Sequence, residues 1–301
     1  MEKKAFELDK LTRRQRHGLL LAAVAPRPIA WVSTVDKDGH VNLSPFSFFN
    51  AFSTSPPIMI FSPGRRGRDS GIKNTHENVL EVPEVAISVV GHDMVQQMSL
   101  TSNDYEKGVN EFIKAGLTMV PSQKIKPPGV AESPVIFECV VNQVIPLGQQ
   151  GGSGNLVIAE VLLMHVDNQY LSGEYDLDIT RLDLIGRMGG NWYSRAFGDA
   201  LFEVPKPTSD LAIGLDQLPK EIRDSKILSG NDLGRLGSMT AVPSSDALEQ
   251  ILQMPEVINV TGDAGLSMST KWEQIQLLGK QWIQQDQTAN ALALMLAYTD
   301  R

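Results

Sequence analysis

The 301-residue chain is long enough to bury a sizeable core, either as one large domain or as one ordinary domain with an appendage of about 100 residues. Hydrophobic residues make up 42% of the chain and charged residues 21%, which excludes a disordered protein. The formal net charge of −8 argues against a general nucleic-acid binder, so any basic site must be local.

The cysteine content and the first 25 residues indicate the cellular compartment of the protein. Cys139 is the only cysteine, which excludes an intramolecular disulfide framework and a cysteine zinc cluster. The apolar run of residues 19–25 is too short to span a bilayer, and charged residues rather than an apolar signal region precede it. We therefore expect a cytoplasmic protein with no membrane and no nucleic-acid partner.

The N-terminal part predicts a helix followed by a hairpin. Thr12 can cap a helix that runs to residue 21 and ends before Pro26, because proline disfavours helix at the preceding residue. Residues 29–35 are rich in β-branched and aromatic side chains, and the Asp-Lys-Asp-Gly sequence of residues 36–39 is typical of a turn. Residues 40–43 are expected to return antiparallel to this strand.

Strands and helices alternate over the next hundred residues. Strands are predicted over residues 58–62, 85–90, 136–145 and 156–167, and helices over residues 75–80, 93–100 and 109–115. The glycine-rich residues 148–154 lie between two strands with no helix to present their amides, which favours a hairpin connection over a phosphate loop. Strands that are neighbours in sequence and short turns predict a mainly antiparallel barrel.

The composition changes near Pro205, and we place a domain boundary between residues 204 and 205. Further along, apolar residues recur at three-to-four spacing from Trp272 to Ile283, which predicts a helix. Residues 205–301 are expected to form a helical C-terminal extension to a domain of residues 1–204.

The segment of residues 44–55, predicted as a loop, interleaves small polar side chains with phenylalanines. The polar members are Ser44, Ser47, Asn50, Ser53, Thr54 and Ser55, and the aromatic members are Phe46, Phe48, Phe49 and Phe52. A flat ring with an apolar face and a hydrogen-bonding edge, such as isoalloxazine, needs a lining of this kind. The alternative is a strand edge that buries its phenylalanines beside a turn.

A second candidate site is Lys73-Asn74-Thr75, at the predicted start of a helix. Asn74 is a good N-cap, and the following amides, the lysine and the hydroxyl can together bind an anion. Three arginines lie just upstream, namely Arg65, Arg66 and Arg68. Planar guanidinium groups bind phosphate in a bidentate manner. The alternative is a solvated loop with an ordinary helix cap.

Other motifs are weaker. The five histidines have no metal-ligand spacing, and no GxSxG, HExxH or Walker pattern is present. Cys139 lies in an apolar strand and is expected in the core rather than as a nucleophile. Arg187, Gly189, Gly190 and Tyr193 can form a clamp, although a plain loop accounts for the same residues.

Several ordered segments together resemble the flavin reductase-like family of FMN-binding split-barrel proteins, which includes flavoredoxin. The segments are PRPIAWVSTVDKDGHVNLSPFSFFNAFSTSPP, GIKNTHENV, AESPVIFECVV, LVIAEVLLMHVD and DITRLDLIGRMGGNWYSR, so the resemblance covers roughly residues 15–200. It implies a mainly β fold with helices, a six-stranded antiparallel split β-barrel, that is usually a homodimer with FMN near the subunit interface.

The resemblance also implies which residues bind the cofactor. Trp31, Ser33 and Thr34 fall on the first barrel strand, Ser47, Phe48, Phe49 and Asn50 on the segment that lines the isoalloxazine, and Ser53 on the ribityl side. Lys73, Asn74 and Thr75 match the family's Lys-Asp-Thr phosphate motif, with Arg66 and Arg68 nearby. Asn74 replaces the acidic member of that motif, which removes a negative charge beside the phosphate. We expect FMN binding to survive this change.

The implied function is an NAD(P)H-dependent flavin reductase or another FMN-dependent oxidoreductase, with no catalytic side chain and no metal, because the flavin carries the chemistry. Two alternatives stay open: an electron carrier like flavoredoxin that exchanges electrons with a redox protein partner, and a non-catalytic flavin-binding protein. Residues 205–301 exceed the shortest family members. They are expected to be a helical cover, with a lid that selects the electron donor or acceptor as the alternative.

Overall fold

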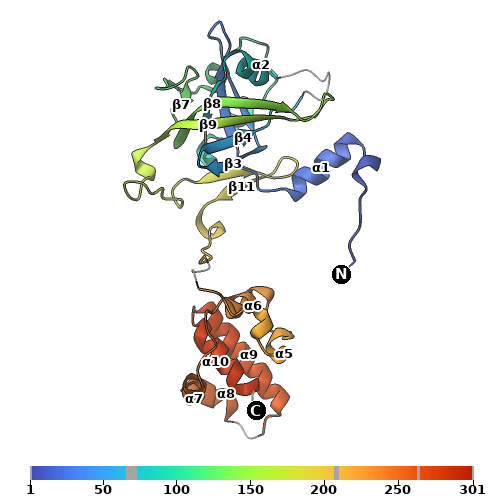
Figure 1. The fold of residues 1–301 in the computed structure, drawn as a ribbon, viewed down its shortest axis with the longest axis vertical. Helices are drawn as coiled ribbons and strands as arrows, with labels where there is room; N and C mark the ends of the chain where they lie inside the picture. The colour runs from blue at the N-terminus through green and yellow to red at the C-terminus, as the bar shows by residue number, and fades with distance from the viewer. Residues whose placement is uncertain (1, 66–72, 207–209, 263–264, 300–301) are drawn as a thin grey trace. The chain divides into compact units, whose positions relative to one another are not determined.

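The computed structural model describes residues 2–65, 73–206, 210–262 and 265–299 (Figure 1). Its contacts divide the chain into two compact units, Met1–Phe202 and Glu203–Arg301. The sequence-based boundary between residues 204 and 205 lies two residues further along. Each unit has its own core and is described by itself.

The first unit is built on an antiparallel sheet that has seven strands among the described residues, in the order β2-β1-β5-β8-β9-β4-β3. These are β1 (Ala30–Val35), β2 (Val41–Phe46), β3 (Phe49–Thr54), β4 (Pro57–Phe61), β5 (Glu84–Ser88), β8 (Val135–Pro146) and β9 (Asn155–Val166). The mainly antiparallel fold with helices is confirmed. The strand count exceeds the predicted six, since most of the predicted 44–55 loop is strand: β2 continues to Phe46, and β3 pairs with β4.

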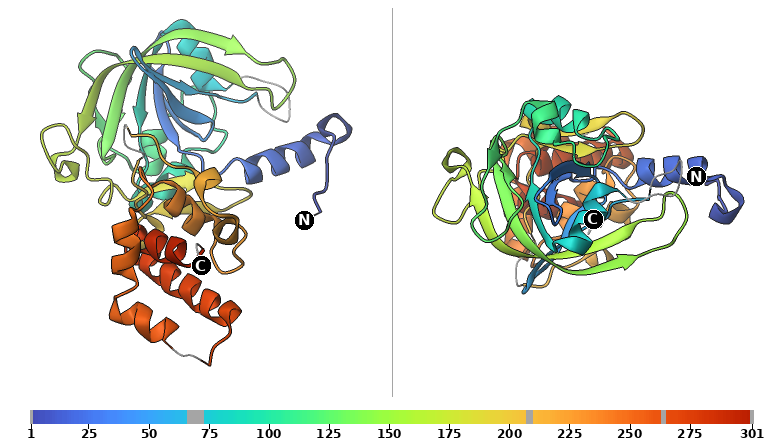
Figure 2. Two further views of the ribbon diagram at one scale, coloured as in Figure 1. Left: turned by 60° about the horizontal axis from the view of Figure 1, so that its bottom comes forward. Right: turned by 90° about the horizontal axis from the view of Figure 1, so that it is seen from above.

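The two edge strands of this sheet, β2 and β3, are consecutive in the chain. Only Ser47 and Phe48 join them, so the two edges of the sheet must meet at this point, which we call the 47–48 corner. The Phe48 carbonyl accepts a hydrogen bond from the Ser62 N–H at 2.9 Å, which ties the corner to the end of β4. The sheet therefore curls into a barrel that is split between β2 and β3, and Figure 2 shows this curvature.

The inner face of the barrel is apolar. Ala30 and Val32 of β1, Phe46 of β2, Phe61 of β4 and Cys139 of β8 all belong to one buried cluster. Burial raises the pKa of the Cys139 thiol to about 12, and the nearby Glu138 carboxylate acts in the same direction. Cys139 is thus a core residue, as the sequence predicts.

The other face of β1 and β2 is covered by short helices. Trp31 and Leu43 pack there against Met98 of α3 (Val95–Leu100) and Phe112 of α4 (Glu111–Ala115). Both faces of β1 are therefore buried, which explains why its burial is continuous along all six residues.

The remaining elements of the first unit surround the barrel. The predicted N-terminal helix is α1 (Arg13–Ala23), and Thr12 and Gln15 form the capping box at its start. The other helix is α2 (Asn74–Glu81), and two small two-stranded sheets are formed by β6 (Met119–Val120) with β7 (Gly129–Val130) and by β10 (Leu184–Arg187) with β11 (Tyr193–Ala196). Residues 148–154 connect β8 and β9 as predicted.

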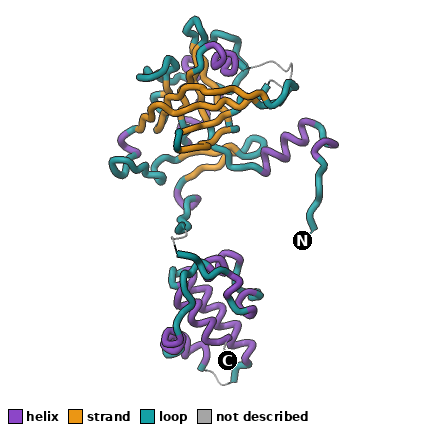
Figure 3. Tube along the Cα trace, in the orientation of Figure 1, coloured by secondary structure: helices purple, strands orange, loops and turns teal. Residues whose placement is uncertain are grey.

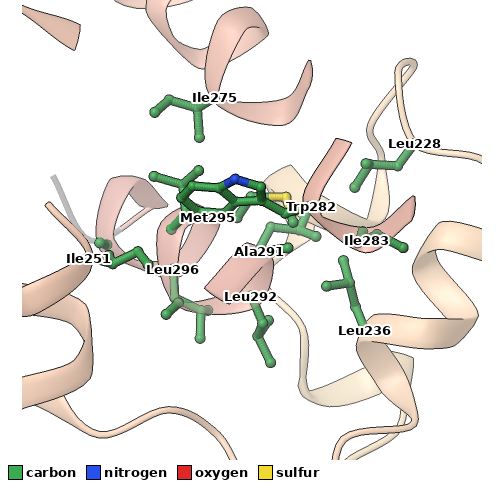
Figure 4. Close-up of a cluster of buried hydrophobic side chains, with 14 of the residues drawn as sticks. Leu228, Leu236, Ile251, Ile275, Trp282, Ile283, Ala291, Leu292, Met295 and Leu296 are labelled. Carbon is green, nitrogen blue, oxygen red and sulfur yellow. The ribbon is translucent and has the colours of Figure 1, made fainter. Parts of the chain in front are cut away.

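The described part of the second unit is helical, as Figure 3 shows, and the predicted helical extension is confirmed. Its helices are α5 (Lys220–Arg223), α6 (Gly230–Gly237), α7 (Ser245–Ile251), α8 (Pro255–Thr261), α9 (Met268–Gln284) and α10 (Thr288–Thr299). Figure 4 shows the centre of its core, where Trp282 of α9 lies beside Met295 of α10 and below Ile275. In both units, no described helix is long and apolar enough to cross a membrane.

Candidate functional site

The N-terminus of α2 carries the predicted anion motif in a slightly different register. Lys73, not Asn74, occupies the N-cap position, with extended φ and ψ of −82° and 154°, and Asn74 is the first helical residue. The Lys73 carbonyl accepts from the N–H groups of His76 and Glu77 at 2.9 and 3.2 Å. Among the described residues, no side chain forms a capping hydrogen bond at this helix start, so its first amides face outward toward the surroundings of Lys73 and Thr75.

Two buried hydrogen bonds fix α2 to the first hairpin. Asn78 Nδ2 donates to Thr34 Oγ1 at 3.1 Å, and Asn42 Nδ2 donates to Thr75 Oγ1 at 3.0 Å. All four side chains are buried. The predicted residues Thr34 and Thr75 therefore come together, and the first turn of α2 is positioned against β2.

A cavity of about 320 Å³ opens beside this helix start, and we call it the α2 cavity. Its lining is mainly polar and comes from β2, the α2 N-terminus, the segment after α3, and α4: Asn42, Ser44, Lys73, Asn74, Thr75, Ser102, Asn103, Asp104, Tyr105 and Glu111. The Lys73 ammonium lies 5.4 Å from the centre of the Phe46 ring, within range of a cation–π contact.

Glu111 lies at the back of the α2 cavity and is almost fully buried. Its Oε2 accepts a hydrogen bond from the Leu43 N–H of β2 at 2.8 Å. Burial raises the pKa of the Glu111 carboxyl, against the effect of this N–H and of its own N–H.

The 47–48 corner presents aromatic surface. Phe48 is 47% exposed and Phe52 is 63% exposed, whereas Phe49 packs against the inner core of the barrel. Phe52 is the extra residue of a β-bulge between Ala51 and Ser53, which accounts for the break in the strand's alternation. Arg27 Nε donates to Ser47 Oγ at 3.4 Å, so a cation lies directly behind the corner.

Trp31 and Ser33 lie behind the site rather than in it. Trp31 has no exposed surface, and its indole N–H donates to Thr101 Oγ1 at 2.8 Å. Ser33 is buried on the same face of β1, and its Oγ has no hydrogen-bond partner among the described residues. The position of Trp31 argues for support of the segment after α3 rather than for contact with a ligand.

The predicted residues thus fall into three groups. Lys73, Asn74 and Thr75 line the α2 cavity; Ser47, Phe48, Phe49, Asn50 and Ser53 belong to the corner and β3; Trp31, Ser33 and Thr34 are buried on β1. Arg66 and Arg68 lie outside the described residues.

Sequence reasoning missed several residues of the α2 cavity. Asn42 alternates with apolar residues on β2, and this period of two was the available signal, whereas Ser44 was predicted as part of the ring lining and lies in the α2 cavity instead. The Ser102–Tyr105 side chains form a polar run after a predicted helix, which was a weaker signal. The sequence around Glu111 contains no signal for the cavity, because α4 and Leu43 come together only in the folded chain.

Comparison with known proteins settles the family. The model of the flavin reductase like domain matches residues 22–178. The chain belongs to the flavin reductase-like family. A protein of Aquifex aeolicus is 37% identical over 188 residues, which are 62% of this chain and 93% of that protein. A protein of Halalkalibacterium halodurans is 36% identical over 203 residues, which are 66% of this chain and 95% of that protein.

Solved structures of this flavin reductase-like fold agree. Nitrilotriacetate monooxygenase component B from Bacillus cereus has 28% identity and a TM-score of 0.63, covering 68% of this chain and 100% of that one. Flavoredoxin of Desulfovibrio vulgaris (Miyazaki F), at 20% identity and a TM-score of 0.51, covers 60% and 91% and shows the fold alone. The family and the Bacillus cereus structure support a flavin-related oxidoreductase function. The residues that the family model matches all lie in the first unit.

Proposed function

We propose that this protein is an FMN-dependent reductase that accepts hydride from NADH or NADPH. The observation that carries the proposal is the pairing of two surfaces on one small barrel: a mainly polar cavity at the N-terminus of α2, and an exposed aromatic corner where the sheet edges meet. A flavin mononucleotide has matching parts, a phosphate at one end and a flat ring at the other.

The residues of the α2 cavity fit a phosphate. The outward amides of α2 and the helix dipole favour negative charge at the position of Lys73 and Asn74. Thr75 Oγ1 accepts from Asn42, which leaves its own proton to donate. Asn74, neutral where the family motif is acidic, adds no repulsion. Lys73, Asn74 and Thr75 would therefore bind the FMN phosphate, and Asn42 would orient Thr75.

The residues of the 47–48 corner and β3 fit the isoalloxazine ring of FMN. Phe48 offers an apolar face, and Ser47, Asn50 and Ser53 offer polar groups beside it. The bound flavin supplies the hydride and electron chemistry. Ser47, with the Arg27 guanidinium behind it, would stabilise negative charge at the polar edge of the ring.

Partners form the remaining part of the proposal. The exposed Phe48 and Phe52 favour a homodimer that covers this corner, which sedimentation velocity would test. The Bacillus cereus relative is by its name one component of a monooxygenase, so an oxygenase partner is our candidate for the acceptor of the reduced flavin. An electron carrier like flavoredoxin is the second candidate, on the basis of the shared fold.

The visible spectrum tests the function. The purified protein should bind FMN and bleach when mixed anaerobically with NADH or NADPH. Bleaching only with a reduced protein partner would favour the carrier. A colourless protein that also fails to bind added FMN would refute the proposal.

The phosphate assignment has its own test. Lys73→Ala should weaken FMN binding by about tenfold or more, the loss expected for one charge-assisted contact, and should leave riboflavin binding nearly unchanged. Lys37→Ala, on the exposed turn between β1 and β2, is the matched control. Equal losses for FMN and riboflavin would show that Lys73 does not contact the phosphate.

A further inference from the structure

A second cavity, of about 440 Å³, lies between α3 and the β10–β11 hairpin, and we call it the hairpin cavity. It shares no residue with the α2 cavity. Its polar lining includes Arg187, Arg195, His92, Gln96, Asn191 and Tyr193. Every one of these side chains can donate a hydrogen bond, and two of them carry a fixed positive charge.

The two arginines differ in their partners. Arg195 forms a bidentate ion pair with Asp183, with both N–O distances at 2.6 Å. Arg187 lies over the Tyr193 ring, 4.5 Å from its centre, and donates to the Trp192 carbonyl at 3.4 Å. Arg187 has no carboxylate partner within the described residues, whereas Asp183, just before β10, is already paired with Arg195.

A third guanidinium increases this local excess of positive charge. Arg27 is buried behind the hairpin and donates to the carbonyls of Leu21, Val24 and Met188, but to no carboxylate of the described chain. Burial lowers the pKa of Arg27, and the charge of Arg187 lowers it further. An anion beside Arg187 would reduce the repulsion between the Arg27 and Arg187 guanidinium groups. This excess of positive charge is local, because the whole chain has a net charge of −8.

Backbone hydrogen bonds and close packing at two glycines attach the β10–β11 hairpin to the segment before β1. Arg27 and Arg187 exchange backbone hydrogen bonds of 3.0 and 2.8 Å. A Cβ at Gly186 would lie 2.7 Å from Pro26 Cβ, and one at Gly189 would lie 3.1 Å from Ala22, so both glycines allow close packing. These contacts hold the hairpin against residues 22–27, and Arg187 lines the cavity from this position.

We propose that the hairpin cavity binds phosphate groups of the pyridine dinucleotide that donates hydride. Planar guanidinium groups match phosphate oxygens, and the 77%-exposed Trp192 beside them offers a face for a base. Helix α3 and the segment after it connect the two sites, because Ser99 of α3 lines the hairpin cavity and Ser102 lines the α2 cavity. This inference rests on the proposed reductase function and adds a second nucleotide site to it.

Calorimetric titration of the full chain, loaded with FMN, with adenosine 2′,5′-bisphosphate and with AMP provides the direct test. Arg187→Gln should weaken binding of these probes, and raise the KM for the dinucleotide, by about tenfold or more. Its kcat at saturation and its FMN affinity should stay unchanged. Arg181→Gln, which removes an exposed arginine outside the cavity, should change none of these values.

A second variant covers the case in which Arg187→Gln fails to fold. Asn191→Asp adds a negative charge to an exposed residue of the cavity and should also weaken binding of the probes. Unchanged probe binding in the folded variants, or an equal loss of FMN affinity, would overturn the inference. If the protein is reduced by NADPH with a KM that neither variant alters, only the hairpin cavity is wrongly assigned. If the wild-type protein binds no FMN, the reductase proposal itself fails.

Discussion

Glu138 is a fully buried carboxylate that connects three segments of the barrel unit. On β8, it accepts hydrogen bonds from the N–H groups of Gln123 and Lys124 at 2.8 and 2.6 Å, and its Oε1 lies 2.6 Å from His165 Nε2 of β9. Burial alone would raise the pKa of Glu138, but these donors outweigh it, and the pKa lies below its ordinary value. The carboxylate thereby attaches the 121–128 segment to the sheet.

Replacing Glu138 should therefore destabilise the barrel. Glu138→Gln leaves one buried N–H without its charged acceptor and is expected to cost roughly 2–3 kcal/mol of unfolding free energy at pH 7. Urea unfolding measures this loss. Glu160→Gln, on the neighbouring strand, is the control, because Glu160 makes only an exposed contact with Asn142. A loss no greater than that of the control would contradict the assignment.

The same residue predicts a dependence on pH. Because its folded-state pKa is lowered, the stability from Glu138 is present above the unfolded-state value of about 4.3 and is lost as the pH falls through the folded-state pKa. The stability difference between wild type and Glu138→Gln should shrink below about pH 4. Melting temperatures of both proteins between pH 7 and 3 test this expectation, and parallel curves would refute it.

Among the secondary-structure elements, α2 is attached to the first hairpin by two buried hydrogen bonds. Asn78→Ala removes the donor to the buried Thr34 hydroxyl and should cost about 1–3 kcal/mol. Because the N-terminal turn of α2 is part of the proposed phosphate site, FMN affinity should fall with it. Asn142→Ala, which removes an exposed side chain, should do neither. A loss of stability with unchanged FMN affinity would show that α2 is not part of the FMN site.

The elements also show what the sequence can predict. Strongly patterned elements, such as α1 with its Thr12 capping box and the long strands β8 and β9, were predicted within a few residues. The predicted 44–55 loop was mostly wrong. Serine, asparagine and Pro45 have low strand propensity, and β2 and β3 form because β1 and β4 supply their hydrogen-bond partners. Such pairing is non-local and leaves little trace in a short window.

The candidate site was predictable to a similar degree. Lys73 and Thr75 were recognisable from helix-start chemistry and from the family resemblance, since both depend on local sequence. Trp31 was assigned from its position alone, whereas its burial against Thr101 depends on folding of a distant segment. The same reason explains why Glu111, far from the motif in sequence, was missed.

At the scale of the whole molecule, the two units have separate cores. The buried cluster of Ile222, Ile275, Trp282 and Met295 lies entirely within residues 203–301, and the barrel clusters lie entirely within the first unit. We expect a polypeptide of residues 203–301 to fold alone, with helical circular dichroism and a cooperative melt.

A polypeptide of residues 1–202 should bind FMN with the affinity of the full chain. An unfolded 203–301 fragment, or lost FMN affinity, would contradict this independence.

The pairing order of the barrel sheet also bears on how fast it folds. Hairpins β1–β2, β3–β4 and β8–β9 unite neighbours in sequence, but Ile58 of β4 pairs with Glu160 of β9, 102 residues later. Such distant pairing is slow to form, whereas a bundle of short helices is fast. In refolding from denaturant, helical signal of residues 203–301 should return first. The 47–48 corner should be assembled last, since the edge strands β2 and β3 can meet there only when every strand between them in the sheet has paired with its neighbour.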